Sequence, residues 1–112
     1  MRYTFKNGIE AEIDFKNKRI SGVYRGGENL ICGNVPFFSV KMRKKDGSHR
    51  IITAFECEYL GENGNIRIYE NADFTVKLSV ILTEKGLRWR IVVDNRTDDL
   101  LEWVELGSFG VC

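Results

Sequence analysis

Apolar and polar residues alternate along most of this chain, and a period of two is typical of half-buried β-strands. In the segment 9–15 the odd positions are apolar, whereas Glu10, Glu12 and Asp14 occupy the even positions. The segment 74–83 places five apolar residues on one face: Phe74, Val76, Leu78, Val80 and Leu82. No segment shows the period of an amphipathic helix. The alternation therefore predicts an all-β domain.

Turn-forming residues separate the alternating segments and predict hairpins. Three two-residue loops are expected, at Asn17-Lys18, Asp46-Gly47 and Asn63-Gly64. The loops at 46–47 and 63–64 flank one long strand over 50–60. Between the loops at 17–18 and 46–47, the pattern is interrupted by Gly33-Asn34 and Pro36. The partners expected across the loops are Phe15–Ile20 and Ile13–Gly22, then Met42–Ile51, Val40–Thr53 and Phe38–Phe55, then Tyr59–Ile68.

Two registers are open for the turn after residue 83, and the apolar match selects between them, because a slip of one residue turns every side chain to the other face. A three-residue loop, 84–86, would set Leu82 and Val80 against arginines. A two-residue loop at Lys85-Gly86 instead sets apolar residues against each other: Leu82–Trp89, Val80–Ile91 and Leu78–Val93. This choice predicts one buried layer formed by Leu78, Val80, Ile91, Val93 and Trp103.

The run 86–106, GLRWRIVVDNRTDDLLEWVEL, is predicted to form two long strands joined by a polar turn at 95–99. Pairing the strands as a hairpin aligns Ile91 with Trp103 and places Arg90 diagonal to Glu102 on the other face. Together with the earlier segments this gives about eight or nine strands. We therefore expect a single antiparallel β-sandwich, joined largely by hairpins and spanning residues 1–112.

Composition supports a globular domain and narrows its partners. The chain has 112 residues, 43% of them hydrophobic, and a net charge of +1, which favours neither nucleic acid nor an anionic membrane. No apolar run approaches the ~20 residues of a membrane span. The N-terminus lacks a signal-peptide core, so a cytoplasmic location is expected unless the sequence is cropped from a longer protein.

Residues with catalytic or metal-binding chemistry are few. His49 is the sole histidine and is expected in a solvated turn. Glu56 and Glu58 are expected on the solvent-exposed face of a strand. Residues 95–97 match a glycosylation sequon, but so short a match often arises by chance. The three cysteines lack metal or redox spacing and favour unpaired thiols: Cys32, Cys57 and Cys112. No catalytic residue, metal or cofactor is predicted, and the isolated chain is not expected to be an enzyme.

The two tryptophans are the candidate ligand-binding residues. Trp89 and Trp103 could form a platform on which a sugar ring stacks. Their apolar neighbours, such as Ile91, Val93 and Leu101, favour burial instead, with the indole N–H at a wet edge. Burial is the favoured interpretation, and the sugar platform stays open as the alternative.

The stretches IEAEIDFKNKRISGVYRGGENLI, at 9–31, and LRWRIVVDNRTDDLLEWVEL, at 87–106, resemble galactose mutarotase-like β-supersandwich domains. Such domains occur on the N-terminal side of many glycoside hydrolases, packed against a catalytic domain. A full supersandwich is about twice this length, and Gly107 stands where the family often has proline. The resemblance implies a fold and a carbohydrate context, and it carries over no functional residue.

The leading hypothesis is a non-catalytic β-sandwich module of a carbohydrate-active protein, which supports a catalytic domain or its substrate cleft. A free-standing sugar-binding domain is the second, and a small structural or oligomerising β protein without a sugar link is the third. Because a supersandwich needs more strands and the sequence ends on Phe109, Val111 and Cys112, we also expect an unfinished surface. A following domain or a second copy would cover that exposed edge or apolar patch.

Overall fold

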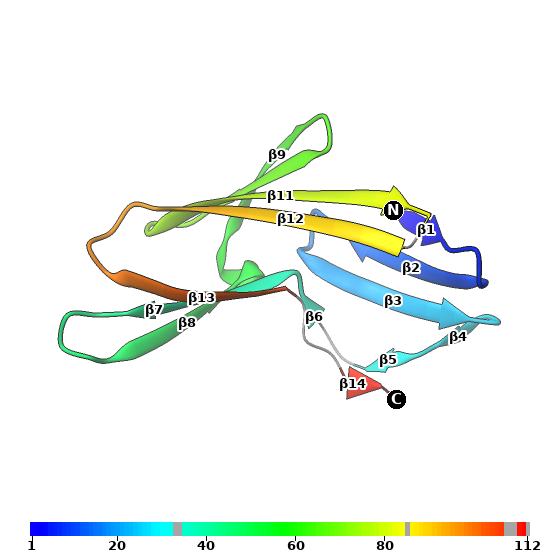
Figure 1. Ribbon diagram of the computed structural model, residues 1–112, viewed down its shortest axis with the longest axis horizontal. Helices are drawn as coiled ribbons and strands as arrows, with labels where there is room; N and C mark the ends of the chain where they lie inside the picture. The colour runs from blue at the N-terminus through cyan, green and yellow to red at the C-terminus, as the bar shows by residue number, and fades with distance from the viewer. Residues whose placement is uncertain (33–34, 85, 107–109, 112) are drawn as a thin grey trace.

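The computed structural model describes residues 1–32, 35–84, 86–106 and 110–111, and over these residues the chain is all-β with antiparallel sheets (Figure 1). The predicted fold class is confirmed. The described strands are β1 (Arg2–Thr4), β2 (Ile9–Asp14), β3 (Arg19–Arg25), β4 (Glu28–Asn29), β5 (Ile31–Cys32), β6 (Val35–Pro36), β7 (Phe38–Arg43), β8 (His49–Thr53), β9 (Glu58–Asn63), β10 (Ile66–Glu70), β11 (Phe74–Thr83), β12 (Gly86–Asn95), β13 (Leu100–Leu106) and β14 (Gly110–Val111).

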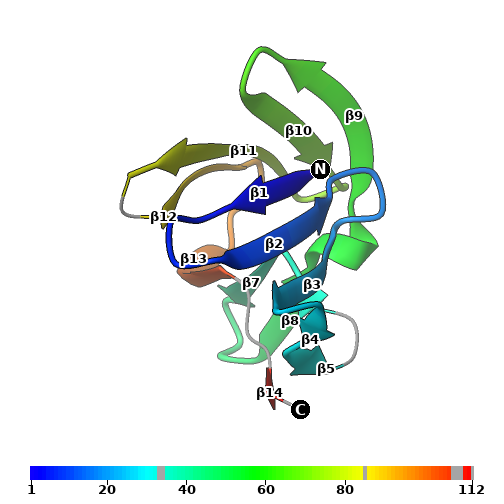
Figure 2. The same cartoon turned by 90° about the vertical axis from the view of Figure 1, so that its right-hand side faces the viewer.

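The strands form three main sheets around a common core (Figures 1 and 2). One sheet has the order β1-β2-β3-β4, with β6 also on β3; the second has the order β12-β11-β10-β9; the third has the order β13-β7-β8; and β14 pairs with β5. The described strand segments number fourteen, more than the eight or nine expected. A 3₁₀ turn divides the strand predicted over 50–60, and short strands of two or three residues account for the other additions.

The core lies between the inner faces of these sheets and is rich in aromatic rings. Phe37 stands 5.5 Å from Phe15 and 6.1 Å from Tyr69, between ring centroids. The buried hydroxyl of Tyr69 donates to the carbonyl oxygen of Phe15 at 3.0 Å. Arg67 is also buried, with its guanidinium 3.9 Å from the centroid of the Phe15 ring and 3.3 Å from Glu62. The core thus includes the guanidinium of Arg67, which the Phe15 ring and the Glu62 carboxylate stabilise.

The β2–β3 hairpin forms as predicted, but its register differs. Ile13 pairs with Ile20 rather than with Gly22, after a bulge at Glu12/Ile13. Asp14 accepts hydrogen bonds from the backbone and side-chain nitrogens of Asn17, at 3.1 and 2.7 Å. These contacts stabilise a four-residue loop over 15–18. The side chain of Phe15 therefore leaves the ladder and enters the core.

The β7–β8 hairpin is shifted by one residue from the predicted register. Val40 pairs with Ile52 and Met42 with Arg50. The backbone N–H of Lys44 donates to the carbonyl of Ser48 at 2.8 Å, so the loop has three residues, 45–47. Its third residue, a glycine, has φ +88°, which suits a type I turn closed by a left-handed residue. The slip buries Val40 and Ile52 together, which the predicted pairing of Val40 with a threonine did not.

The strand predicted over 50–60 is divided by a 3₁₀ turn, η1 (Ala54–Glu56). The carboxylate of Glu56 accepts a hydrogen bond from the backbone N–H of Thr53 at 2.7 Å and so caps this turn. Glu56 and Glu58 therefore do not share a strand face, and the expected pair Phe38–Phe55 does not form. The turn moves the chain from the third sheet to the second, where β9 follows.

The β9–β10 turn uses residues 64 and 65 rather than 63 and 64, because Asn63 pairs with Ile66. Gly64 has φ +61° at the first central position, where type II′ turns place glycine. A bulge at Ile68/Tyr69 then pairs Tyr59 with Tyr69 instead of Ile68. The hairpin is confirmed and its register is corrected.

The β11–β12 register differs from the prediction by two residues, and this leaves every face unchanged. Thr83 pairs with Gly86, so Leu78 lies opposite Ile91 and Val80 opposite Trp89. The residue Lys85 of the predicted loop lies outside the described residues, as do Gly33, Asn34, Phe109 and Cys112. Four members of the predicted layer face the core: Leu78, Val80, Ile91 and Val93.

The predicted hairpin between β12 and β13 is wrong, because β13 pairs with β7 in another sheet. Asn95 explains the crossing: its side-chain oxygen accepts from the backbone and hydroxyl of Thr97, and its amide nitrogen donates to the carbonyl of Asp99 at 2.8 Å. The backbone of Arg96 also donates to Asp73 at 2.9 Å. The segment 95–99 is therefore an anchored connection between sheets rather than a tight turn.

Candidate functional site

The two candidate tryptophans lie on different sheets and have different roles. Trp89 on β12 faces the core, with its ring 6.1 Å from that of Phe37. Trp103 on β13 pairs with Lys41 on β7 and shares the outer face of the third sheet, where it is 36% exposed. The favoured interpretation, burial, therefore applies to Trp89, and placing Trp103 in the buried layer is wrong. The two rings do not form a shared platform.

The outer face of the third sheet is the candidate site, and we call it the Trp103 face. It comprises Trp103, Lys41, Arg43, His49 and Glu102 from strands β13, β7 and β8. Alternation on β7 builds it, since Phe38, Val40 and Met42 are fully buried and the residues between them point outward. A bulge between Leu101 and Trp103 lets Glu102 and Trp103 share one side.

One carboxylate holds the charged groups of the Trp103 face together. Glu102 contacts the guanidinium of Arg43, the Nδ1 of His49 at 3.0 Å and the Nζ of Lys41 at 3.6 Å. The Lys41 Nζ also lies 5.9 Å from the centroid of the Trp103 ring. An exposed indole thus stands next to hydrogen-bond donors and a carboxylate acceptor, all on the same face of the sheet.

The electrostatics of this cluster favour an ionised carboxylate. Burial alone would raise the pKa of Glu102, but the positive charge of Arg43, followed by that of His49 and Lys41, more than offsets burial and lowers it. Three basic side chains face this one acid. At neutral pH the Trp103 face therefore carries an ionised carboxylate surrounded by basic side chains.

The arrangement can bind a ring but does not assemble a hydrolytic relay. His49 is 41% exposed in its side chain and contacts Glu102, while the hydroxyl of the adjacent Ser48 donates to Asp46 at 2.6 Å. The nucleophile–base contact that acyl transfer needs is thus not made by this neighbouring pair. His49 begins β8, so its expected place in a turn is corrected by one residue.

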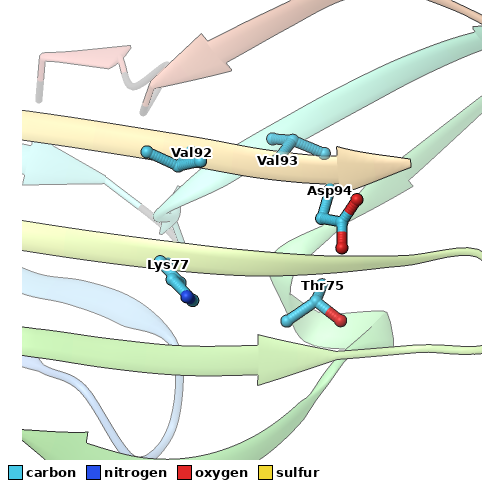
Figure 3. Close-up of a pocket in the computed structure, with 5 residues that line it drawn as sticks. All are labelled: Thr75, Lys77, Val92, Val93 and Asp94. Carbon is cyan, nitrogen blue, oxygen red and sulfur yellow. The ribbon is translucent and has the colours of Figure 1, made fainter. Parts of the chain in front are cut away.

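A second surface feature lies on the outer side of β11 and β12. It is a hollow of about 390 Å³ lined by the outward residues Thr75, Lys77, Val92 and Asp94 and by Val93, which lies between the last two in the strand (Figure 3). Its polar groups are one hydroxyl, one amine and one carboxylate. The hollow belongs to the second sheet, so it is separate from the Trp103 face on the third.

The remaining residue types with reactive side chains are the cysteines and the possible metal ligands. Cys57 is a buried free thiol, and burial raises its pKa to about 11, which makes it a poor nucleophile at neutral pH. The side chains of Cys32 and Cys112 lie outside the described residues. Across the described parts of the chain, no three His, Cys, Asp or Glu side chains group as a metal site would require.

Comparison of the chain with protein-family models, with curated proteins and with solved structures found no match. Among the residues that the structure describes, no helix has the length and apolar character that a membrane crossing requires. The function is therefore inferred from the geometry of the described surfaces.

Sequence reasoning named Trp103 but missed the group around it. Lys41 and Arg43 are two residues apart in a predicted strand, and this spacing indicates that both side chains point to the same side. Glu102 was instead paired with Arg90, because β13 was placed beside β12. The pairing of β7 with β13 joins segments about sixty residues apart, and local pattern carries no signal for that choice.

Proposed function

We propose that this chain is a non-catalytic β-sandwich module that binds carbohydrate through the Trp103 face. The observation that carries the proposal is the exposed indole of Trp103 beside the ammonium of Lys41 and the carboxylate of Glu102. The resemblance of the chain to galactose mutarotase-like domains supports the same ligand class. The module would supply substrate contacts to a glycoside hydrolase-type catalytic domain, or bind sugar by itself.

The chemistry of the face suits a sugar ring. The C–H groups on one side of a pyranose pack on an indole, and the hydroxyl groups at its rim need both donors and acceptors. Lys41 and Arg43 donate, and Glu102 accepts. Because the face presents one partly exposed ring, we expect weak binding that gains strength when several sugar units or several modules act together.

Titration of the chain with a panel of soluble oligosaccharides, followed by calorimetry, tests the proposal. Trp103→Ala should weaken binding about five- to thirtyfold, because a stacked ring contributes on the order of 1–2 kcal/mol. Ile81→Ala is the matched control. It removes another exposed apolar side chain, from β11 in the second sheet, and should leave affinity unchanged.

Both variants should melt within a few degrees of the parent, since both side chains are partly exposed. Failure of the parent chain to bind any glycan in the panel would overturn the proposal. Binding that survives Trp103→Ala would move the site away from this face. Binding lost equally in Ile81→Ala would show that the variants act through the fold.

A further inference from the structure

The strand β12 has an open edge that differs from the other sheet edges. Within the described residues it pairs with β11 alone, over ten residues in unbroken register. Figure 1 shows it as the outermost strand of its sheet. Among the residues that the structure describes, its alternate N–H and C=O groups therefore have no strand partner on the far side. Such an edge is a template for another strand.

The other edges are protected by irregularities. A bulge interrupts β9 at its pairing with β10, and another interrupts β13. The strand β1 has only three residues, and β8 ends at the 3₁₀ turn. Bulges and short strands are the means by which proteins block edge-to-edge pairing. Among the described edges, β12 is long and regular, so pairing is favoured there.

The inner face of β12 is incompletely covered. Its inward side chains pack against the core but remain half-buried: Leu87, Trp89, Ile91 and Val93. A further strand beside β12 would cover them. The outer face of the same strand alternates exposed Arg88, Arg90, Val92 and Asp94. No ion pair joins Arg88, Arg90 or Asp94 to another described residue.

The sequence of β12 is complementary to itself in one antiparallel register. We propose that two copies of this chain pair β12 with β12 around a two-fold axis at Ile91, joining two four-stranded sheets into one. In this register Arg88 of each copy lies opposite Asp94 of the other. On the inner face Trp89 lies opposite Val93, and Ile91 lies opposite itself, so the apolar rows continue across the interface.

Competing registers are less favourable for stated reasons. A two-fold axis at position 90 sets Arg90 against itself, and like charges directly opposite destabilise a strand pair. An axis between residues sets inner side chains against outer ones. An axis at Val92 pairs Arg90 with Asp94, but it shortens the overlap and brings Arg88 opposite Arg96. The axis at Ile91 uses all nine residues from Leu87 to Asn95.

Sedimentation of the full chain over a concentration series tests the proposal, and charge reversal tests the register. The parent should reach a dimer. Arg88→Glu and Asp94→Arg should each raise the dimer dissociation constant about tenfold, because each disrupts two symmetric cross-strand pairs. The double variant R88E/D94R should restore the parent's dissociation constant, since the two charges exchange places.

Arg25→Glu is the matched control, because it reverses an exposed arginine at the end of β3. It should leave the dimer unchanged. A parent chain that stays monomeric at every concentration would overturn the proposal. A dimer that resists both single reversals would also overturn it. Rescue of Asp94→Arg by Arg90→Glu instead of by Arg88→Glu would contradict the axis at Ile91. Thermal melts of each variant show that the fold persists.

Discussion

Strands β11 and β12 carry the same alternating pattern and pair residue for residue, yet they are buried to different extents. On β11 the inward side chains of Phe74, Val76 and Leu78 are fully buried. Their partners on β12 are only half-buried. The strands β7 and β13 repeat the difference, since Phe38 is fully buried and its partner Leu106 is 39% exposed.

The difference teaches that position in the sheet, rather than apolar content, sets burial here. A central strand has neighbours on both sides and a packed layer beneath it, whereas an edge strand has one neighbour. The chain therefore has a tightly packed interior along β7 and β11 and a looser margin along β12 and β13. Both proposals centre on this margin, on the edge of β12 and on Trp103 of β13, where side chains are available to partners.

A buried charge gives the largest expected contrast between the two regions. Val80→Asp on β11 should unfold the domain, because Val80 is 4% exposed and an unpaired buried carboxylate costs several kcal/mol. Val92→Asp on the outer face of β12 should change stability by about 1 kcal/mol or less, since Val92 is 48% exposed. Circular dichroism melts of dilute protein measure both. Equal melting of Val80→Asp and the parent would show that β11 is not central.

Truncation of one cross-strand pair gives a finer measure. Leu78 and Ile91 lie directly opposite each other on the inner face. Leu78→Ala should destabilise the chain by about 2–5 kcal/mol through the cavity that it leaves. Ile91→Ala should cost roughly half as much, because its side chain is already partly hydrated. Urea unfolding gives both values. Equal losses would remove the distinction between interior and margin.

Removal of the carboxylate that binds β13 to β7 and β8 should have the smallest effect. The fold lowers the pKa of Glu102, so its ionised form stabilises the native state above the ordinary carboxyl range. That stability is lost as pH falls through the lowered pKa. Glu102→Gln should therefore lower Tm at neutral pH, and the difference from the parent should shrink in acid.

The matched control for this change is Glu105→Gln on the same strand. Glu105 is exposed and has no ion pair with the described residues, so its substitution should leave Tm unchanged at every pH. A Tm difference for Glu102→Gln that grows on acidification would contradict the sign of the pKa shift. Equal effects of the two substitutions would show that the cluster on the Trp103 face contributes no specific stability.

The sequence by itself determined the fold class, because alternation with a period of two appears in local segments and needs no knowledge of partners. It also determined which side of β2 and β11 faces the core. Even the wrong register between β11 and β12 preserved these faces, since the error was two residues. By contrast, a one-residue error at β7–β8 gave both Val40 and Met42 the wrong partner, because a glycine with positive φ lengthened the loop.

Only the tertiary structure decided which strands are neighbours beyond the local hairpins. The polar segment after β12 could equally close a hairpin or carry the chain to another sheet. Side-chain hydrogen bonds of Asn95, and the contact of Arg96 with Asp73, select the second outcome. That choice placed Trp89 in the core and Trp103 outside, and it brought Glu102 to Lys41, Arg43 and His49. Contacts between distant segments depend on the packing of the whole chain, so no local pattern contained them.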